Sequence, residues 1–132
     1  MSNFTVRTRK RSELVCITKQ VARCVEKSGV RDGIAVVFCP HTTAGITINE
    51  NADPDVPSDM VMKLEKLIER EDRDYRHNEG NSDSHVKSTL TGASETVIIR
   101  EGRLVLGTWQ GIYFTEFDGP RTRSVHVKVM AG

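Results

Sequence analysis

The sequence has 132 residues, of which 37% are hydrophobic and 28% are charged, and this composition is typical of a single globular domain. Nineteen basic residues oppose eighteen acidic ones, and the net charge of +1 argues against the strong positive field of a nucleic-acid-binding protein. No segment approaches the roughly 18 apolar residues of a membrane span, and the amino terminus lacks the apolar run of a secretion signal. We therefore expect one domain over residues 1–132, located in the cytoplasm, with neither a nucleic-acid nor a membrane partner.

The three cysteines, Cys16, Cys24 and Cys39, are an odd number and include no C-x-x-C pair. This pattern favours reduced thiols in a cytosolic protein over a disulfide framework. Cys39 ends the apolar run GIAVVFC, so we interpret it as a buried, inert thiol. The alternative is a nucleophile, which would need one of the histidines as its base.

The first part of the chain has the periodicities of strands and of one helix. Apolar and polar residues alternate in residues 3–9, and short apolar runs follow at residues 13–17 and 33–39, so we predict three strands there. Between the second and third strands, Thr18 caps a helix that Gly29 ends in the left-handed conformation.

A further strand is predicted where Ile46 and Ile48 alternate with Thr47 and Asn49, and Glu50 then breaks the alternation. By parity the carboxylate of Glu50 points into the core, where an unpaired charge is costly. Either the strand therefore ends at Glu50 or the carboxylate has a partner. A binding site in which the carboxylate of Glu50 has a partner explains this residue better than a purely structural role does.

The middle of the chain is helical and the last third is rich in strands. An apolar stripe predicts a helix that begins at Ser58 or Asp59, and a short helix capped by Asp83 or Ser84 ends at Gly92. The segments TVIIR, RLVLGT, IYFTEF and RSVHVKVM are joined by tight turns and predict an antiparallel meander. The whole pattern indicates an α+β fold, a two-sheet β-sandwich with intervening helices.

Two basic runs occur in the sequence, RTRKR at residues 7–11 and RTR at residues 121–123. Alternating basic residues are usual on the solvent-facing side of a strand, so we interpret both runs as surface. His126 alternates with valines and shares its predicted face with Lys128, which also indicates a surface position. Trp109 lies in the corner GTWQG and is interpreted as a packing or subunit-contact residue, with stacking on a ring-shaped ligand as the alternative.

The other three histidines are the residues most typical of a reactive site. His41 follows the strand at residues 33–39, while His77 and His85 lie in the polar segment RHNEGNSDSHVKS, residues 76–88. His85 falls in the first turn of a predicted helix, whose free N–H groups suit an anion. Three histidines with carboxylates nearby match the donors that zinc, iron or manganese accept. The sequence therefore indicates a candidate divalent-metal site, and capped surface turns are the alternative.

Three blocks of the sequence together resemble one known family: HTTAGITINENADP, NSDSHVKSTLTG and GRLVLGTWQGIYFTEFDGPRTR. They are similar in order and spacing to the YjbQ-type family of small bacterial and archaeal proteins, and the similarity extends from about Phe4 to Val129. The resemblance implies a YjbQ-like sandwich assembled as a homotrimer, with a polar pocket and a divalent metal, zinc or similar, on the histidines. The pocket residues implied in this way are His41, Asn49, Glu50, His77, Asn81, His85, Ser88, Gln110 and Arg121 or Arg123.

The resemblance also implies an activity, because members of this family are catalogued as secondary thiamine-phosphate synthases. The reaction joins hydroxymethylpyrimidine diphosphate to thiazole phosphate and releases pyrophosphate. In this hypothesis the metal is held by the histidines, Ser88 and Arg121 bind phosphate, and Glu50, Asn49 and Gln110 are the catalytic residues, with Glu50 as base or as a partner of the metal ligands. The second hypothesis is a trimer that binds a small phosphorylated metabolite without catalysis.

Overall fold

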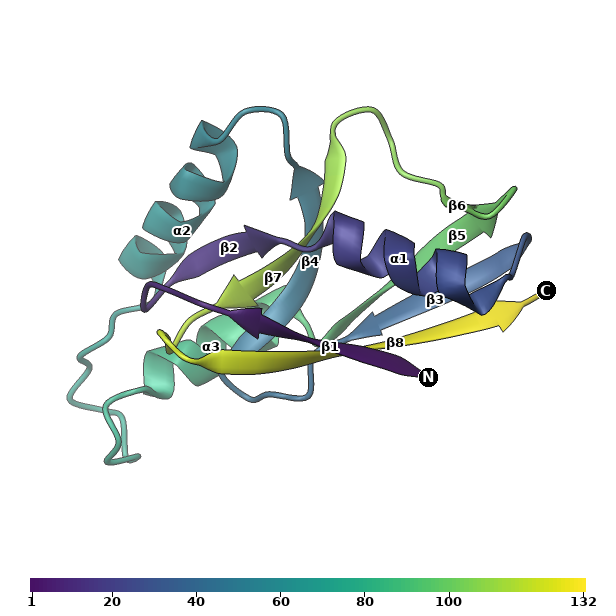
Figure 1. The fold of residues 1–132 in the computed structure, drawn as a ribbon. Coiled ribbons are helices and arrows are strands. Elements are labelled where there is room, and N and C mark those ends of the chain that lie inside the picture. Colours follow the sequence, from purple (N-terminus) through teal and green to yellow (C-terminus); the bar gives the residue numbers. More distant parts are fainter.

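The computed structural model describes all 132 residues as eight strands and three helices. In chain order they are β1 (Ser2–Arg7), β2 (Glu13–Cys16), α1 (Thr18–Ser28), β3 (Gly33–Phe38), β4 (Ala44–Glu50), α2 (Asp55–Leu67), α3 (Ser82–Thr91), β5 (Ser94–Arg100), β6 (Arg103–Leu104), β7 (Gln110–Glu116) and β8 (Thr122–Ala131). The predicted α+β class is confirmed, since the strands form two antiparallel sheets (Figure 1).

The five-stranded sheet has the order β1-β8-β3-β5-β6 and the three-stranded sheet the order β2-β7-β4. The meander predicted for the last third of the chain is only partly correct. β5 and β6 form the predicted hairpin, but β7 moves to the centre of the other sheet, and β8 returns between β1 and β3. Ile112 and Phe114 on β7 are fully buried, which fits the central position of β7 between β2 and β4. Turn patterns report local geometry and do not reveal this change of sheet.

The hydrophobic core lies between the two sheets and α1. Val37 and Val125 contribute from the five-stranded sheet, Ile112 and Phe114 from the three-stranded sheet, and Val25 from α1. Figure 1 shows α1 and the three-stranded sheet on the same side of the five-stranded sheet. Gly29 follows α1 with φ of 71°, so the predicted end of this helix is confirmed. The predicted cap is wrong, since Ile17 is the N-cap and Thr18 is the first residue of the helix.

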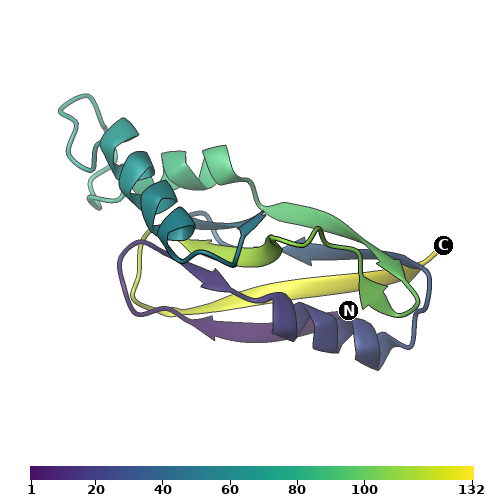
Figure 2. The same ribbon diagram turned by 90° about the horizontal axis from the view of Figure 1, so that it is seen from above.

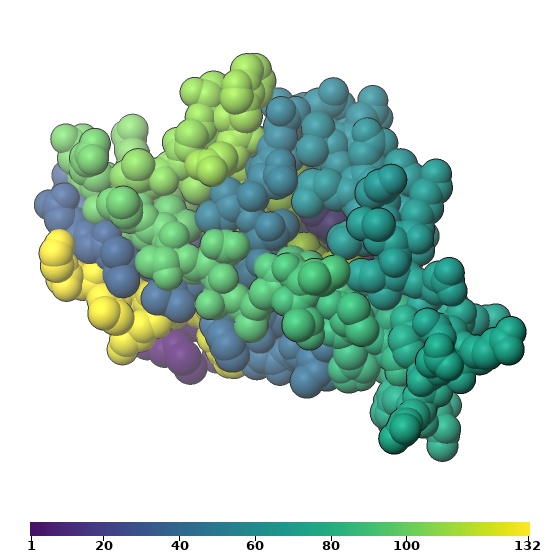
Figure 3. Space-filling view, turned by 180° about the vertical axis from the view of Figure 1, so that it is seen from behind, coloured from purple at the N-terminus to yellow at the C-terminus, as the bar shows by residue number.

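The other two helices cover the outer face of the three-stranded sheet, where α2 packs on β2 and β4 and α3 packs on β4 (Figure 2). α2 begins at Asp55, earlier than the predicted Ser58 or Asp59. Pro57 is tolerated because the first turn of a helix does not use its own N–H groups. Between α2 and α3 the surface is hollowed over β2, which shows purple at the bottom of the hollow in Figure 3.

The opposite face of the five-stranded sheet is not covered by any helix. Ile34 on β3 pairs with Met130 on β8 and with Ile98 on β5. Ile98 is 57% exposed and Met130 is 46% exposed, and Phe38 on the same face of β3 is 42% exposed. An apolar group of this kind on a sheet face is typical of a contact surface.

Candidate functional site

The predicted site residues lie at two ends of β4. His41 precedes the strand by three residues, and at the same end the hydroxyl of Ser88 donates a hydrogen bond of 2.7 Å to the carbonyl oxygen of Ala44. Glu50 lies at the other end and pairs with Gln110 on β7. At about 3.3 Å per strand residue, the two ends are roughly 20 Å apart. A single chain therefore does not bring all the predicted residues into one pocket.

β4 ends at Glu50. This confirms the first of the two alternatives predicted for Glu50, namely that the strand ends there. Its side chain is half-buried and its carboxylate has no ion-pair partner in this chain. The backbone carbonyl of Glu50 accepts a hydrogen bond of 2.9 Å from the hydroxyl of Tyr113. Nearby, Asn49 Oδ1 accepts from the backbone N–H of Glu50, and Gln110 Oε1 accepts from the N–H of Gly107. The three side chains predicted to be catalytic thus share one end of the three-stranded sheet.

His41 is held in a neutral form. Its Nε2 accepts a hydrogen bond of 2.9 Å from the backbone N–H of Ser124, and its ring packs edge-on against Phe114. Burial, followed by the nearby positive charge of Arg123, lowers the pKa of His41 below its ordinary value. A metal ion bound through Nε2 would have to displace the N–H of Ser124.

Of the three histidines predicted to share a metal site, His77 and His85 lie close together. Their ring centroids are 5.7 Å apart with nearly perpendicular planes, and Nε2 of His77 lies 3.6 Å from a carboxylate oxygen of Glu79. His85 lies in the first turn of α3, after the N-cap residue Asn81. The loop at residues 68–81, which ends at this helix, extends away from the sheets (Figure 1).

His77, His85 and Glu79 form a small group of possible metal donors. Two imidazoles and one carboxylate are suitable ligands for zinc, but no three His, Cys, Asp or Glu side chains converge as a metal-binding group in this chain. The site of His41, His77 and His85 therefore stays a prediction. His77 and His85 are the two of these residues that could hold a metal together.

A cavity of about 570 Å³ opens where β1 leaves its partner β8, and we call it the arginine cavity. Its lining contains no carboxylate, and Pro120 is its one apolar residue. The lining residues are Arg7, Thr8, Arg9, Pro120, Arg121 and Thr122. Arg7 and Arg9 take part in none of the ion pairs of the chain. The two basic runs interpreted as surface thus meet around one polar cavity.

The arginine cavity is connected to the histidines through Asp118. Arg121 donates through Nη2 to Asp118 Oδ2 at 3.2 Å, and Asn81 donates through Nδ2 to the same oxygen at 2.9 Å. The side-chain oxygen of Asn81, Oδ1, is buried without a hydrogen-bond partner. A buried acceptor without a donor is costly, and it lies at the start of the helix that carries His85.

Two buried ion networks hold this end of the molecule and were missed by sequence reasoning. Glu116 is fully buried and accepts hydrogen bonds from Arg123 Nε at 2.9 Å and from the hydroxyl of Thr8 at 2.8 Å. Because Thr8 also lines the arginine cavity, this network fixes the cavity wall. No local signal relates Thr8 to Glu116, which is more than 100 positions away in the chain.

The second network is centred on Asp83, which is fully buried in α3. Arg11 donates to both of its carboxylate oxygens at 3.1 Å, and Lys87 donates at 3.1 Å. Burial acts to raise the pKa of Asp83, but the hydrogen bonds and charges of Arg11 and Lys87 outweigh it and hold the pKa below its ordinary value. The spacing of Asp83 and Lys87, one helical turn apart, was a signal in the sequence for this pair.

Comparison with known proteins agrees with this fold and places it in one family. The model of the family described as "UPF0047 protein YjbQ-like" matches residues 2–132. The chain is 51% identical to the UPF0047 protein YugU of Bacillus subtilis, with 98% of each chain covered. It is 54% identical to the UPF0047 protein MJ1081 of Methanocaldococcus jannaschii, over 96% of this chain and 91% of that protein.

Solved structures show the same architecture. An uncharacterised YjbQ/UPF0047-family protein of Clostridium acetobutylicum superposes with a TM-score of 0.96 at 55% identity, covering 98% of this chain and 100% of that chain. A YbjQ-like protein of unknown function from Sulfolobus solfataricus gives a TM-score of 0.93 at 38% identity, covering 99% and 96%. The fold is thus that of a small two-sheet α+β protein with a polar, arginine-lined end. The chain belongs to the UPF0047 family of YjbQ-like proteins.

No helix of this chain is both long enough and apolar enough to cross a membrane.

Proposed function

We propose that the protein binds a small phosphorylated metabolite in the arginine cavity. The observation that carries this proposal is the lining itself, which places three arginines around about 570 Å³, with threonines and one proline as the other lining residues and no carboxylate in the wall. Guanidinium groups bind phosphate through two parallel hydrogen bonds. A cavity with this lining favours a compact, highly charged anion over an apolar ligand.

A second candidate function is the transferase reaction that forms thiamine phosphate from its pyrimidine diphosphate and thiazole phosphate precursors. Both precursors are phosphorylated, so the arginine cavity suits this substrate class. Arg7, Arg9 and Arg121 would neutralise the charge of the departing pyrophosphate. A divalent metal, if bound by His77 and His85, would add positive charge near the leaving group.

Assembly as a homotrimer is part of the same proposal. Glu50, Asn49 and Gln110 lie roughly 20 Å along β4 from the end near the histidines, so a neighbouring copy is needed to supply them to the same pocket. The uncovered face of the five-stranded sheet, with Phe38, Ile98 and Met130 exposed, offers an apolar surface for such an assembly. The three free cysteines fit a cytoplasmic location.

One experiment separates the two candidate functions. Each precursor is added to the purified protein and the melting temperature is measured, after which both are added and thiamine phosphate and pyrophosphate are assayed. Stabilisation without product supports the binding protein, because only a ligand of the folded state raises the melting temperature. Product that disappears in Arg121→Gln supports the transferase. Absence of both stabilisation and product contradicts the transferase, and absence of stabilisation by inorganic pyrophosphate as well contradicts the binding function.

A further inference from the structure

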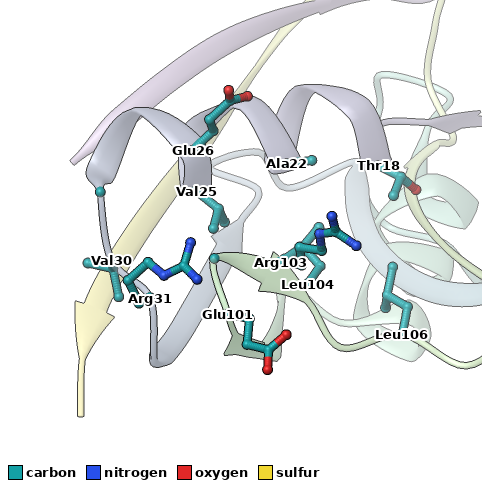
Figure 4. A pocket seen from close by; sticks show the side chains of 12 residues that line it. Thr18, Ala22, Val25, Glu26, Val30, Arg31, Glu101, Arg103, Leu104 and Leu106 are labelled. Atoms are coloured by element: carbon teal, nitrogen blue, oxygen red, sulfur yellow. The ribbon is translucent and has the colours of Figure 1, made fainter.

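A second cavity lies away from the histidines and from the arginine cavity. It has a volume of about 770 Å³ and opens between α1 and the β5–β6 hairpin (Figure 4). Thr122 of β8 pairs with Arg7 of the arginine cavity, whereas Ala131 at the other end of β8 pairs with Gly33, two residues after Arg31 of this cavity. At about 3.3 Å per residue the two cavities are roughly 30 Å apart along the strand. We call the one beside α1 the α1 cavity.

The wall of the α1 cavity is mixed, and five of its twelve lining residues are apolar. Val25 and Ala22 contribute from α1, Val30 from the turn that follows, and Leu104 and Leu106 from β6 and the segment after it. Val25 belongs to the buried core, and Val30, Leu104 and Leu106 pack against that core while remaining partly exposed. The cavity therefore offers fixed apolar contacts to a ligand of small-molecule size, since known ligand cavities have volumes of about 300–1,000 Å³.

Two arginines line the same cavity as these apolar side chains. Figure 4 shows the guanidinium groups of Arg31 and Arg103 on either side of Val25, whereas the carboxylate of Glu26 points outward from α1. Glu26 and Glu101 also line the cavity, but neither of them nor either arginine takes part in an ion pair within the chain. Arg31 and Arg103 are thus free to bind an anionic group.

Local backbone geometry keeps Arg31 over the cavity. The N–H of Gly102 donates a hydrogen bond of 2.9 Å to the carbonyl oxygen of Arg31. Gly102 has a φ of 75°, and a Cβ at this position would lie 3.3 Å from Nη1 of Arg31. Glycine at the tip of the hairpin therefore provides both the left-handed turn and the space that the guanidinium group occupies.

We propose that the α1 cavity binds a small amphipathic anion, with an apolar body against Val25, Leu104 and Leu106 and one carboxylate or phosphate group between Arg31 and Arg103. The apolar side chains of the cavity alone would accept many uncharged molecules. The two unpaired arginines add a requirement for negative charge, because a charge-assisted hydrogen bond contributes more than a neutral one. This site is independent of the proposed function, since the two cavities share no residue.

The test uses octanoate as the probe, octanol as its uncharged match and octyl phosphate as the phosphate arm. Each is titrated into the whole protein with methyl-labelled leucine and valine, and binding is followed by NMR at Leu104 and Val25. Octanoate or octyl phosphate is expected to bind at least about tenfold more tightly than octanol, and the tighter of the two identifies the anionic group.

Two variants test whether Arg31 and Arg103 cause the preference for an anionic ligand. In Arg31→Gln/Arg103→Gln the affinity for the tighter anion is expected to fall to the level of octanol. Arg100→Gln is the control, because Arg100 is exposed, is the cross-strand partner of Arg103 and does not line the cavity. Equal affinity for the anions and octanol, no shift at Leu104 and Val25 with either anion, or an equal loss in Arg100→Gln would overturn the proposal.

Discussion

Arg7 on β1 and Thr122 on β8 are directly paired in the five-stranded sheet. This pair joins two basic segments that lie more than 100 residues apart in the sequence, and the arginine cavity forms around it. Each segment alone has the pattern of a solvated strand face. Their pairing concentrates three guanidinium groups at one end of the molecule, next to the helix that carries His85.

The buried carboxylate of Asp83 is expected to stabilise the fold through its two cationic partners. Asp83→Asn leaves Lys87, which is 1% exposed, without a negative partner, and removing one member of a buried ion pair costs about 3–5 kcal/mol. The free energy of unfolding, measured with urea, checks this value. Asp74→Asn, in the exposed loop before α3, is the control and should change the free energy by less than about 0.5 kcal/mol. Equal stability of the two variants would contradict the network.

His41 is expected to make stability depend on pH. Its pKa is lowered in the folded protein, so the unfolded chain binds the proton more tightly and stability rises with pH in this range. The contribution is fully present above the unfolded pKa of about 6.5 and is lost as the pH falls toward the lower folded pKa. Urea unfolding from pH 8 to pH 5 should show this loss for the wild type and a smaller loss for His41→Asn. Identical slopes would show that His41 is not the group responsible.

Ser88 has two possible roles that can be separated by one substitution. Its hydroxyl donates to Ala44 and so ties α3 to β4, whereas the sequence predicted that it binds phosphate. Ser88→Ala should lower the free energy of unfolding by about 1–3 kcal/mol, because the carbonyl loses its donor. If the role is purely structural, the affinity for inorganic pyrophosphate is unchanged in the same variant. A loss of affinity with unchanged stability would instead support the role predicted from the sequence.

The histidine pair gives a direct prediction about metal binding. Zinc alone, titrated calorimetrically into the purified protein, should bind more weakly to His85→Ala than to the wild type, because His77 and His85 provide the two adjacent imidazoles. His126→Ala is the matched control, since His126 lies on β8, in the five-stranded sheet. Equal zinc binding by the wild type and His85→Ala would remove the histidine pair from the proposal.

Local features of the fold could be predicted from the sequence, and long-range pairing could not. Gly29 ends α1 because a left-handed residue is needed there, and this need is visible in the sequence around it. The position of β8 between β1 and β3 depends on which buried faces fit together. That information is distributed over the whole chain. The tight turns alone therefore predicted an antiparallel meander for the last third of the chain.

The same limit applies to the candidate site. His77 and His85 are eight residues apart and lie in one loop and the first turn of one helix, so their proximity was predictable from local sequence. The arginine cavity depends on the register of β1 with β8, and the burial of Glu116 depends on Arg123 and Thr8. A single sequence does not contain a local signal for these contacts.

Calorimetric titration with inorganic pyrophosphate shows whether the arginine cavity binds phosphate groups. The wild type should bind, and Arg7→Gln/Arg9→Gln should bind at least about tenfold more weakly, because two guanidinium partners are lost. Arg73→Gln, in the exposed loop before α3, removes a positive charge outside the cavity and should leave the affinity within about twofold. Binding that is equally weak in the wild type and the cavity variant, or equally strong in both, would contradict the account.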